Sequence, residues 1–528
     1  MFDQSAMGDE TAVGLFESSG TGLPRRQFLK AAGATAGALL AAGSGFNAMA
    51  STAASDITRL SALELSSAIK SRKVSCREVM NAYLDRIDQN NATFNAVVSL
   101  ADRAQLLEQA TKADADLSQG HYRGWMHGFP MAIKDLANAE GFITSKGSPL
   151  YATDVAKGDD IHVARMKAAG GIVIGKTNVP EFGLGSQSYN PVFGATKCAW
   201  DGFSTAGGSS GGAAASLALQ MQPVADGSDL MGSLRNPAAF NNVIGFRPTP
   251  GRVPIYGLFV EDLPCNGPMG RNVSDTAMLL STQAGYDPSA PTTIPEDSKQ
   301  FAAPLGRDFK GSKIGWLGDF DGYLPMESGV LSLCEKAMSA FGDIGCEVEN
   351  ATIDHSMAEL WQTWLTFRHW IVAGMFKHLY MNPEKRALLK PECQWEVEGG
   401  LELTGSDVFA ASIARAKFYA ALLKAFERYD FLVLPAAQVF PFDASIHWPK
   451  EVAGKTMDTY HRWMEVVIPG TLSGCPVAAV PAGFGRDGLP MGLQIIGPRY
   501  KDFATLQIAY AYEQASRWNL DFTPKAVA

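Results

Sequence analysis

Residues 207–249 read GGSSGGAAASLALQMQPVADGSDLMGSLRNPAAFNNVIGFRPT and contain two turns rich in glycine and serine. The first turn precedes an alanine-rich stretch that predicts a helix over 211–221, and the second follows a short strand over 223–225. Tight turns at the start of a helix explain the glycines at 207–212. They do not explain a second Gly-Ser turn at Gly232-Ser233, with Arg235 and Pro237 close behind it. The stretch therefore indicates chemistry at its serines.

Helix and strand patterns alternate on both sides of this stretch. Capping-box patterns at Ser61–Glu64 and Ser75–Glu78 each predict the start of an amphipathic helix. The alternation favours an α/β fold, a single large domain with a mixed β-sheet core covered by helices on both faces. No internal repeat and no linker marks a second domain. The expected helices and strands are: helices 101–117, 161–169, 276–284 and 331–341, and strands 128–133, 171–174, 243–246, 313–317, 431–434, 476–480 and 491–496.

Residues 355–430 predict a helical region with many aromatic side chains. Trp361, Trp364, Phe367 and Ile371 recur at helical spacing, which is typical of a buried helix face. The same side chains also suit the lining of a substrate pocket. The sequence leaves both interpretations open.

The first fifty residues resemble a bacterial twin-arginine export signal. Arg25, Arg26, Phe28, Leu29 and Lys30 precede a weakly apolar stretch over 31–46, and the sequence Ala-Met-Ala over 48–50 suits a signal peptidase. A buried alanine-rich helix is the alternative, but four glycines within 31–46 disfavour it. We therefore expect a signal peptide over 1–50, a catalytic domain over 51–528, and a periplasmic or secreted protein.

Composition excludes several classes of protein. Among the 528 residues 46% are hydrophobic and 19% charged, which is typical of a globular chain. The net charge of -9 argues against a nucleic-acid partner, because phosphate binding needs a basic surface. The sequence contains no run of about 20 apolar residues, so we predict no stable insertion into a membrane. Seven dispersed cysteines indicate neither a disulfide framework nor a zinc site, and leave open whether Cys334 and Cys346 pair.

Two motif matches are misleading. Residues 170–177 fit the phosphate-loop pattern G-x-x-x-x-G-K-[ST], yet Ile172–Ile174 has the pattern of a strand and not of a flexible loop. Residues 207–211 fit G-x-S-x-G, but no apolar strand leads into that turn. His447 and His461 lie where an elbow-type hydrolase keeps its base, and neither has a distinctive context. Nucleotide binding and a Ser-His-Asp hydrolase are both disfavoured.

The blocks described above, together with others, resemble the amidase signature family. Besides the two serine turns, the similarity rests on GFPMAIKD over 128–135, GKTNVPEF over 175–182, GCPVAAVP over 474–481 and GLPMGLQ over 488–494. Because these ordered blocks extend over about 57–516, the resemblance is far more specific than either misleading motif. It implies the amidase signature fold and a serine amidase that needs no metal or other cofactor.

The family's Ser–cis-Ser–Lys triad falls on Ser233, Ser209 and Lys134. The resemblance implies that Ser233 is the nucleophile, that Ser209, held by a cis peptide, relays protons, and that Lys134 is the base. A working lysine must be neutral near pH 7, about 3 units below its ordinary pKa, and the apolar residues 131–133 suggest the burial that this requires.

Backbone amides of the second turn would form the oxyanion hole. The expected donors are Leu230, Met231 and Gly232, with Ser210, Asp229 and Arg235 as supporting residues. Met231 departs from the family's pattern, since it stands where a glycine is usual. A methionine side chain there predicts a narrower pocket.

The predicted function is hydrolysis of a carboxylic amide C–N bond through an acyl-enzyme. Carbamates, esters and cyclic or oligomeric amides are alternative substrates of the same fold, and a non-catalytic binding protein is an alternative of a different class. The expected partner is a small-molecule amide, and a second copy in a homodimer is left open.

Overall fold

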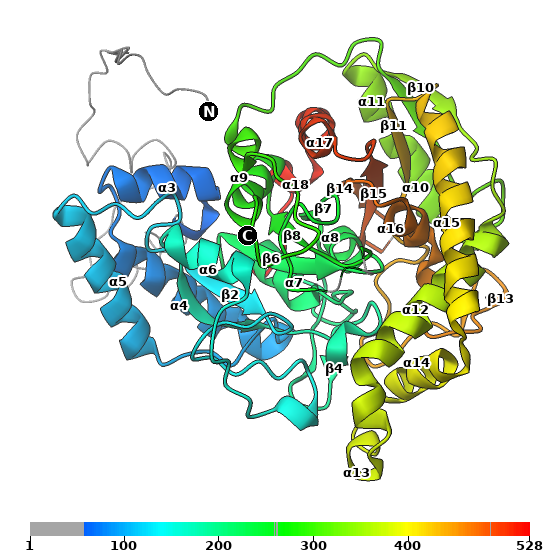
Figure 1. Cartoon of the computed structure of the whole chain (residues 1–528). Helices are drawn as coiled ribbons and strands as arrows, with labels where there is room; N and C mark the ends of the chain where they lie inside the picture. Colours follow the sequence, from blue (N-terminus) through cyan, green and yellow to red (C-terminus); the bar gives the residue numbers. More distant parts are fainter. Residues whose placement is uncertain (1–56, 258, 260–261, 486) are drawn as a thin grey trace, which may run out of the picture. The chain divides into compact units, whose positions relative to one another are not determined.

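The computed structural model describes residues 57–528 except 258, 260–261 and 486 (Figure 1). The predicted export signal over 1–50 lies outside the described residues. The described residues belong to one unit, which has the mixed sheet and the surrounding helices that the sequence predicts.

The central sheet has eight strands in the order β10-β9-β11-β15-β14-β7-β8-β6. β9 pairs in parallel with β10 and β11, and every other neighbouring pair is antiparallel, so the sheet is mixed. Its strands are β6 (Val224–Asp229), β7 (Ile244–Arg247), β8 (Cys265–Gly270), β9 (Lys313–Trp316), β10 (Glu347–Asn350), β11 (Phe431–Pro435), β14 (Val477–Phe484) and β15 (Pro490–Ile496).

A three-stranded sheet of order β1-β3-β2 carries the predicted lysine. It consists of β1 (Val97–Val98), β2 (Pro130–Lys134) and β3 (Ile172–Thr177). β2 also packs against β6 of the central sheet, and the Lys134 N–H donates to Asp226 Oδ1 at 3.0 Å. The end of β2 is thereby fixed beside the strand that leads into the second serine turn. Two hairpins complete the strands: β4 (Tyr189–Asn190) with β5 (Gly194–Ala195), and β12 (Glu451–Val452) with β13 (Lys455–Thr456).

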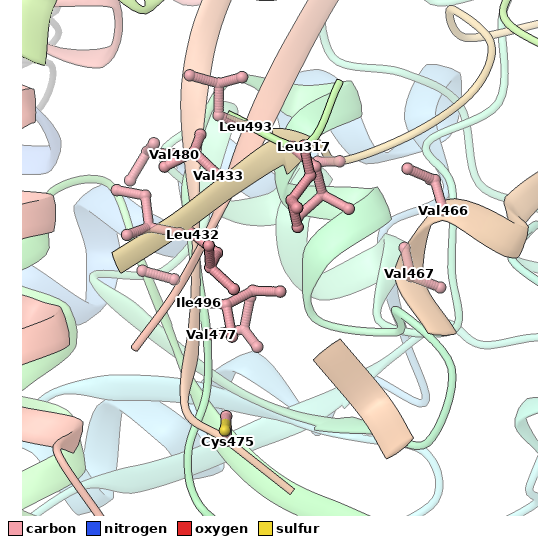
Figure 2. Close-up of a cluster of buried hydrophobic side chains, with 14 of the residues drawn as sticks. Leu317, Leu432, Val433, Val466, Val467, Cys475, Val477, Val480, Leu493 and Ile496 are labelled. Carbon is pink, nitrogen blue, oxygen red and sulfur yellow. The ribbon is translucent and has the colours of Figure 1, made fainter. Parts of the chain in front are cut away.

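Helices cover both faces of the central sheet. Every residue of β11 and β15 is buried, and successive side chains of a strand point to opposite faces. Helix α8 (Arg235–Asn241) packs on β7, β14 and β15, while α9 (Val273–Gln283), α10 (Val330–Ala337) and α17 (Asp502–Ser516) also contact the sheet. Figure 2 shows the core where Leu432, Val433, Val477, Val480 and Leu493 meet.

Most remaining helices lie at the predicted positions. Both predicted capping boxes are formed, at Ser61–Glu64 and Ser75–Glu78. The helices are α3 (Ala62–Lys70), α4 (Cys76–Phe94), α5 (Arg103–Ser118), α6 (Ile161–Ala168), α7 (Gly211–Ala218), α11 (Ser339–Asp343), α16 (Ile468–Ser473) and α18 (Trp518–Asp521), with 3₁₀ turns η1 (Pro149–Tyr151), η2 (Glu181–Gly183), η3 (Ser298–Ala302) and η4 (Arg462–Val467).

The region 355–430 is helical, as predicted, and lies beside the core. It holds α12 (Met357–Tyr380), α13 (Pro383–Arg386), α14 (Pro391–Glu402) and α15 (Gly405–Phe426). Figure 1 shows α12 running next to α14 and α15, and α12 contacts both. Trp361, Trp364, Phe367 and Ile371 are all buried in the main hydrophobic cluster. The burial of these four side chains supports the interpretation as a buried helix face.

The structure answers two questions that the sequence raises, about the cysteines and about possible membrane-spanning helices. All seven cysteines are buried free thiols, so Cys334 and Cys346 do not pair. Within the part of the chain that the structure describes, no helix combines the length and apolarity that crossing a bilayer requires.

Candidate active site

Lys134 ends strand β2 with its side chain fully inside the protein, at 1% exposure. Its Nζ lies within hydrogen-bond distance of three hydroxyls: Ser209 Oγ at 2.9 Å, Ser210 Oγ at 2.7 Å and Ser228 Oγ at 2.9 Å. The Ser228 carbonyl oxygen lies 3.2 Å from the same nitrogen. Lys134 is thus held by four oxygens. Ser228 is not among the predicted site residues, although its place in Gly227-Ser228-Asp229, directly before the second turn, is a usable signal.

The surroundings of Lys134 favour the neutral amine. Burial removes water from the ammonium ion and lowers the pKa of Lys134 to about 7, while the carboxylates of Asp226 and Asp229 oppose part of this shift. A neutral amine has two N–H groups and one lone pair. The Ser228 carbonyl oxygen can only accept a hydrogen bond, so one N–H turns to it and the lone pair can accept a proton from a serine hydroxyl.

The two serines of the predicted triad differ in their surroundings. Ser209 lies two residues before α7, follows a cis peptide bond after Gly208, and is 2% exposed beside Lys134. Ser233 is 7% exposed and lines a small cavity. Over the described residues the Ser233 hydroxyl has no hydrogen-bond partner, whereas its carbonyl accepts from the Ser210 N–H at 3.2 Å. The structure therefore brings Lys134 and Ser209 into contact and places Ser233 at the cavity.

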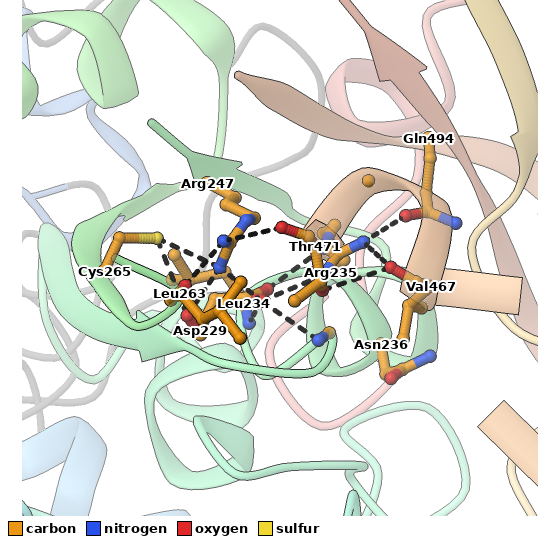
Figure 3. Close-up of polar contacts among 12 residues, drawn as sticks. Asp229, Leu234, Arg235, Asn236, Arg247, Leu263, Cys265, Val467, Thr471 and Gln494 are labelled. Atoms are coloured by element: carbon orange, nitrogen blue, oxygen red, sulfur yellow. Dashed lines mark hydrogen bonds and ion pairs between the residues drawn. The ribbon is translucent and has the colours of Figure 1, made fainter. Parts of the chain in front are cut away.

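A buried ionic network holds the second turn in place (Figure 3). Asp229 accepts two hydrogen bonds from Arg235, at 2.9 and 3.0 Å, and one from Arg247 at 3.1 Å. It also accepts from the Gly232 and Leu234 N–H groups. Burial alone would raise the pKa of Asp229, but the two guanidinium groups hold it well below its usual value. Asp229 is therefore a permanent anion at the base of the turn.

Arg235 ties this network to the helix that follows η4 and to the central sheet. It donates to Val467 O, Thr471 Oγ1 and Gln494 Oε1, at 2.7, 2.8 and 2.6 Å. Neither Arg235 nor Asp229 is among the residues that line the cavity at Ser233. Both side chains thus brace the turn, as supporting residues.

Two of the three predicted oxyanion donors are free. The Gly232 N–H already donates to Asp229 Oδ1 at 3.0 Å, so it is not free to serve as the oxyanion donor that we expected. In the described part of the chain the N–H groups of Leu230 and Met231 have no hydrogen-bond partner, and neither does that of Ser233. The left-handed backbone of this turn falls on Gly232, with φ +79°, and not on Met231. Methionine is therefore accommodated at 231 without an unfavourable φ.

The cavity at Ser233 is small and has a polar wall. Its volume is about 20 Å³, room for one water-sized group, so an amide substrate must move some of the lining side chains or extend beyond the cavity. Met231 lines it and is itself 4% exposed. Arg368, Tyr460 and His461 also line it. Sequence patterns do not single out these three residues, because they lie on α12 and just before η4, far from the family's blocks.

The two misleading motifs have structural explanations. Residues 172–177 form strand β3 itself, and Lys176 is buried, with Nζ 3.9 Å from Asp135 and 3.1 Å from Thr144 Oγ1. The turn at 207–211 follows a loop that begins at Trp200 and not a strand. Among the described residues, no three or more histidine, cysteine or acidic side chains lie together in a group that could hold a metal ion.

Comparison with known proteins places the chain in a family. The family model named Amidase matches residues 78–506. An acylamidase of Rhodococcus erythropolis is 31% identical, over 87% of this chain and 96% of that protein. A glutamyl-tRNA(Gln) amidotransferase subunit from a Cyanothece strain is 32% identical, over 86% of this chain and 98% of that protein. The crystal structure of a bacterial aryl acylamidase of the amidase signature family superposes with a TM-score of 0.81, at 28% identity, over 87% of this chain and 97% of the other.

These similarities and the buried lysine–serine site define an enzyme of one class. The chain belongs to the amidase family, and its fold is that of the amidase signature enzymes. It is a serine amidase, a hydrolase that acts on the carbon–nitrogen bond of amides.

Proposed function

We propose that this amidase cleaves carboxylic amides through an acyl-enzyme on Ser233, with Ser209 as proton relay and Lys134 as general base. The observation that carries the proposal is the contact of a buried lysine, whose pKa is lowered to about 7, with the Ser209 hydroxyl at 2.9 Å. A neutral amine in this position accepts a proton from Ser209, which in turn accepts one from Ser233.

The steps follow from this relay. Ser233 Oγ attacks the amide carbonyl carbon as its proton passes to Ser209 and the proton of Ser209 passes to Lys134. The oxygen of the tetrahedral intermediate would accept hydrogen bonds from the N–H groups of Leu230 and Met231, which are free in the described structure. The relay then returns a proton to the leaving amine. A water molecule, activated by the same relay, releases the acid and restores Ser233.

The Ser209–Ser233 hydrogen bond is the contact that ligand binding has to complete. Catalytic hydrogen bonds are often long in free enzymes and form in the substrate complex. The position of the Ser233 hydroxyl next to the cavity is compatible with this order of events.

Amide hydrolysis is tested with a set of anilides and the matched esters and carbamates. Ser233→Ala, Ser209→Ala and Lys134→Ala should each lower kcat by a factor of about 10³ or more in folded protein. Hydroxylamine should divert product to the hydroxamate, since an acyl-enzyme reacts with any small nucleophile. Turnover that persists in Ser233→Ala would overturn the assignment of the nucleophile. A folded wild type without turnover on the whole set would favour the binding-protein alternative.

Transamidation is a second candidate because relatives named as amidotransferase subunits match this chain about as well as the acylamidase does. We favour hydrolysis by the chain alone, since a net charge of -9 is unfavourable for binding transfer RNA. The rate of acid release without any added nucleophile decides between the two. A transferase would give little free acid with water alone, whereas a hydrolase gives acid at full rate.

We also propose, from the sequence of residues 1–50, that the protein is exported. Export would make it a periplasmic or secreted protein. Residues 51–528 would then form the mature domain. The test is a fusion of residues 1–50 to a reporter that is exported only when folded. Exchange of Arg25 and Arg26 for lysine should keep the reporter in the cytoplasm. Equal export with and without the exchange would contradict the proposal.

A further inference from the structure

Arg368 places a charged donor in the cavity that also holds Ser233. It lies on α12 and is 5% exposed. Its Nε donates to Glu396 Oε1 at 2.9 Å, and one Nη donates to the Tyr460 hydroxyl at 2.9 Å. Across the described residues the other Nη has no hydrogen-bond partner. Arg368 and Tyr460 line the cavity, whereas Glu396 does not. Arg368 therefore brings a guanidinium with one unpaired Nη to the lining of the cavity that also holds Ser233.

The positive charge of Arg368 is balanced by the carboxylate of Glu396, with which it forms an ion pair. Burial would raise the pKa of Glu396, but the guanidinium of Arg368 lowers it to about 2, so the two side chains form an ion pair. The second oxygen of Glu396 lies 2.8 Å from Nδ1 of His369, which does not line the cavity. Burial lowers the pKa of His461 to about 3, which leaves that imidazole neutral, and raises the pKa of the Tyr460 phenol well above its usual value. The wall thus offers hydrogen-bond donors but no unbalanced positive charge.

The balance of charge selects among acceptors. A bound carboxylate would place a second buried anion near Glu396 with only one arginine in the wall to neutralise both, and an uncompensated buried charge is costly. An uncharged carbonyl or ether oxygen accepts from the free Nη without that cost. A hydrogen bond from a charged donor is stronger than one between neutral groups, so it discriminates between otherwise similar substrates.

We propose that Arg368 is a specificity residue that binds a second, uncharged oxygen acceptor of the substrate, such as a ketone or a further amide carbonyl. The inference rests on the proposed hydrolysis at Ser233 and adds a requirement on the rest of the substrate molecule. Amides with such an acceptor are then better substrates than equally long alkyl amides.

A purely structural role for Arg368 gives different results. Its contacts join α12 to Glu396 on α14 and to Tyr460, so its loss also weakens packing. Weaker packing lowers turnover of all substrates alike. Recognition by the free Nη changes the ratio between substrates, which is therefore the quantity to measure.

The test compares three anilides of equal length with a plain alkyl, a ketone or a carboxylate group in the acyl part, and a second set with these groups in the amine part. In the wild type, kcat/KM for the ketone should exceed that for the alkyl compound by about tenfold in at least one set. Arg368→Lys should abolish this ratio, since a compact ammonium group cannot serve Glu396, Tyr460 and a ligand together.

Arg462→Lys is the matched control. Arg462 also pairs with a carboxylate, Glu465 at 2.8 Å, and lies over the ring of Trp361, but it does not line the cavity. Its exchange should keep the ketone-to-alkyl ratio. An unchanged ratio in Arg368→Lys, or a wild-type preference for the carboxylate compound, would overturn the proposal.

Binding to Ser233→Ala separates this proposal from that of the hydrolysis itself. Calorimetric titration of this variant with the ketone and alkyl anilides measures recognition without turnover. Tighter binding of the ketone that is lost in Ser233→Ala/Arg368→Lys supports the acceptor site even if the chemistry differs from the proposed one. Equal binding of the ketone and alkyl anilides would contradict the proposed acceptor site at Arg368.

Discussion

Lys134 can accept a proton only when its amine is neutral, and its position decides at which pH that happens. Burial lowers its pKa to about 7, and the ammonium form predominates below that value. We therefore expect kcat/KM for an anilide to rise with pH through about 7 and to level off above it. A profile between about pH 5 and 9 measures this, with a protein thermal scan at each pH to exclude unfolding. A flat profile would rule out the lysine as base.

Met231 lies in the second turn and lines the cavity at Ser233. Met231→Gly should enlarge the cavity and raise kcat/KM for bulky acyl groups relative to acetyl. The same exchange should cost about 2–5 kcal/mol of unfolding free energy, because the buried side chain packs in the core. Urea unfolding and a graded acyl series measure the two effects. If Met231→Gly prefers the same acyl length as the wild type, the side chain does not set the pocket size.

At the scale of elements, the turn between β6 and α8 depends on Asp229. Asp229→Asn keeps the shape of the side chain but leaves two buried guanidinium groups without their counter-ion. The expected loss is about 3–5 kcal/mol of unfolding free energy, together with a fall in kcat as the amides of the turn shift.

Asp85→Asn provides the control for this prediction. Asp85 pairs with Arg103 on the surface, at 47% exposure, where an ion pair contributes at most about 1 kcal/mol. Similar stability losses in Asp229→Asn and Asp85→Asn by urea unfolding would contradict the role given to the buried network.

Elements with regular patterns are predictable from the sequence, and those without are missed. β11 is a continuous apolar run and β15 is apolar except for Gln494, and the predicted strands match them within a residue or two. The sequence does not predict β8, because Cys-Asn-Gly-Pro-Met-Gly has two glycines and a proline, which usually mark turns. Gly267 is required there, since a Cβ atom would lie 2.3 Å from Phe246 O. β10, with four exposed residues at the sheet edge, shows no apolar alternation.

For the whole molecule, the site is predictable only where it consists of contiguous motifs. Lys134, Ser209 and Ser233 each lie in a recognisable block. The opposite wall of the cavity joins Arg368 on α12 to Tyr460 and His461, which lie in a distant part of the chain. No local pattern marks such a pairing, because packing of the helical region against the core creates it.

The seven thiols test the packing of the whole chain. All are buried, and burial raises the pKa of Cys198 and Cys265, for example, to about 12. We expect a disulfide-exchange reagent at about pH 8 to react slowly with the native protein and to find seven thiols once urea unfolds it. Rapid reaction of the folded protein, or fewer thiols after unfolding, would contradict the packing or reveal a disulfide.

Labelling the protein with a fluorophosphonate probe, followed by mapping of the modified peptide by mass spectrometry, tests the role of Ser233 most directly. A serine activated by the Lys134–Ser209 pair should react, so we expect a label on Ser233 that is lost in Lys134→Ala. A label on Ser209, or on Ser233 to the same extent without Lys134, would contradict this role of Ser233.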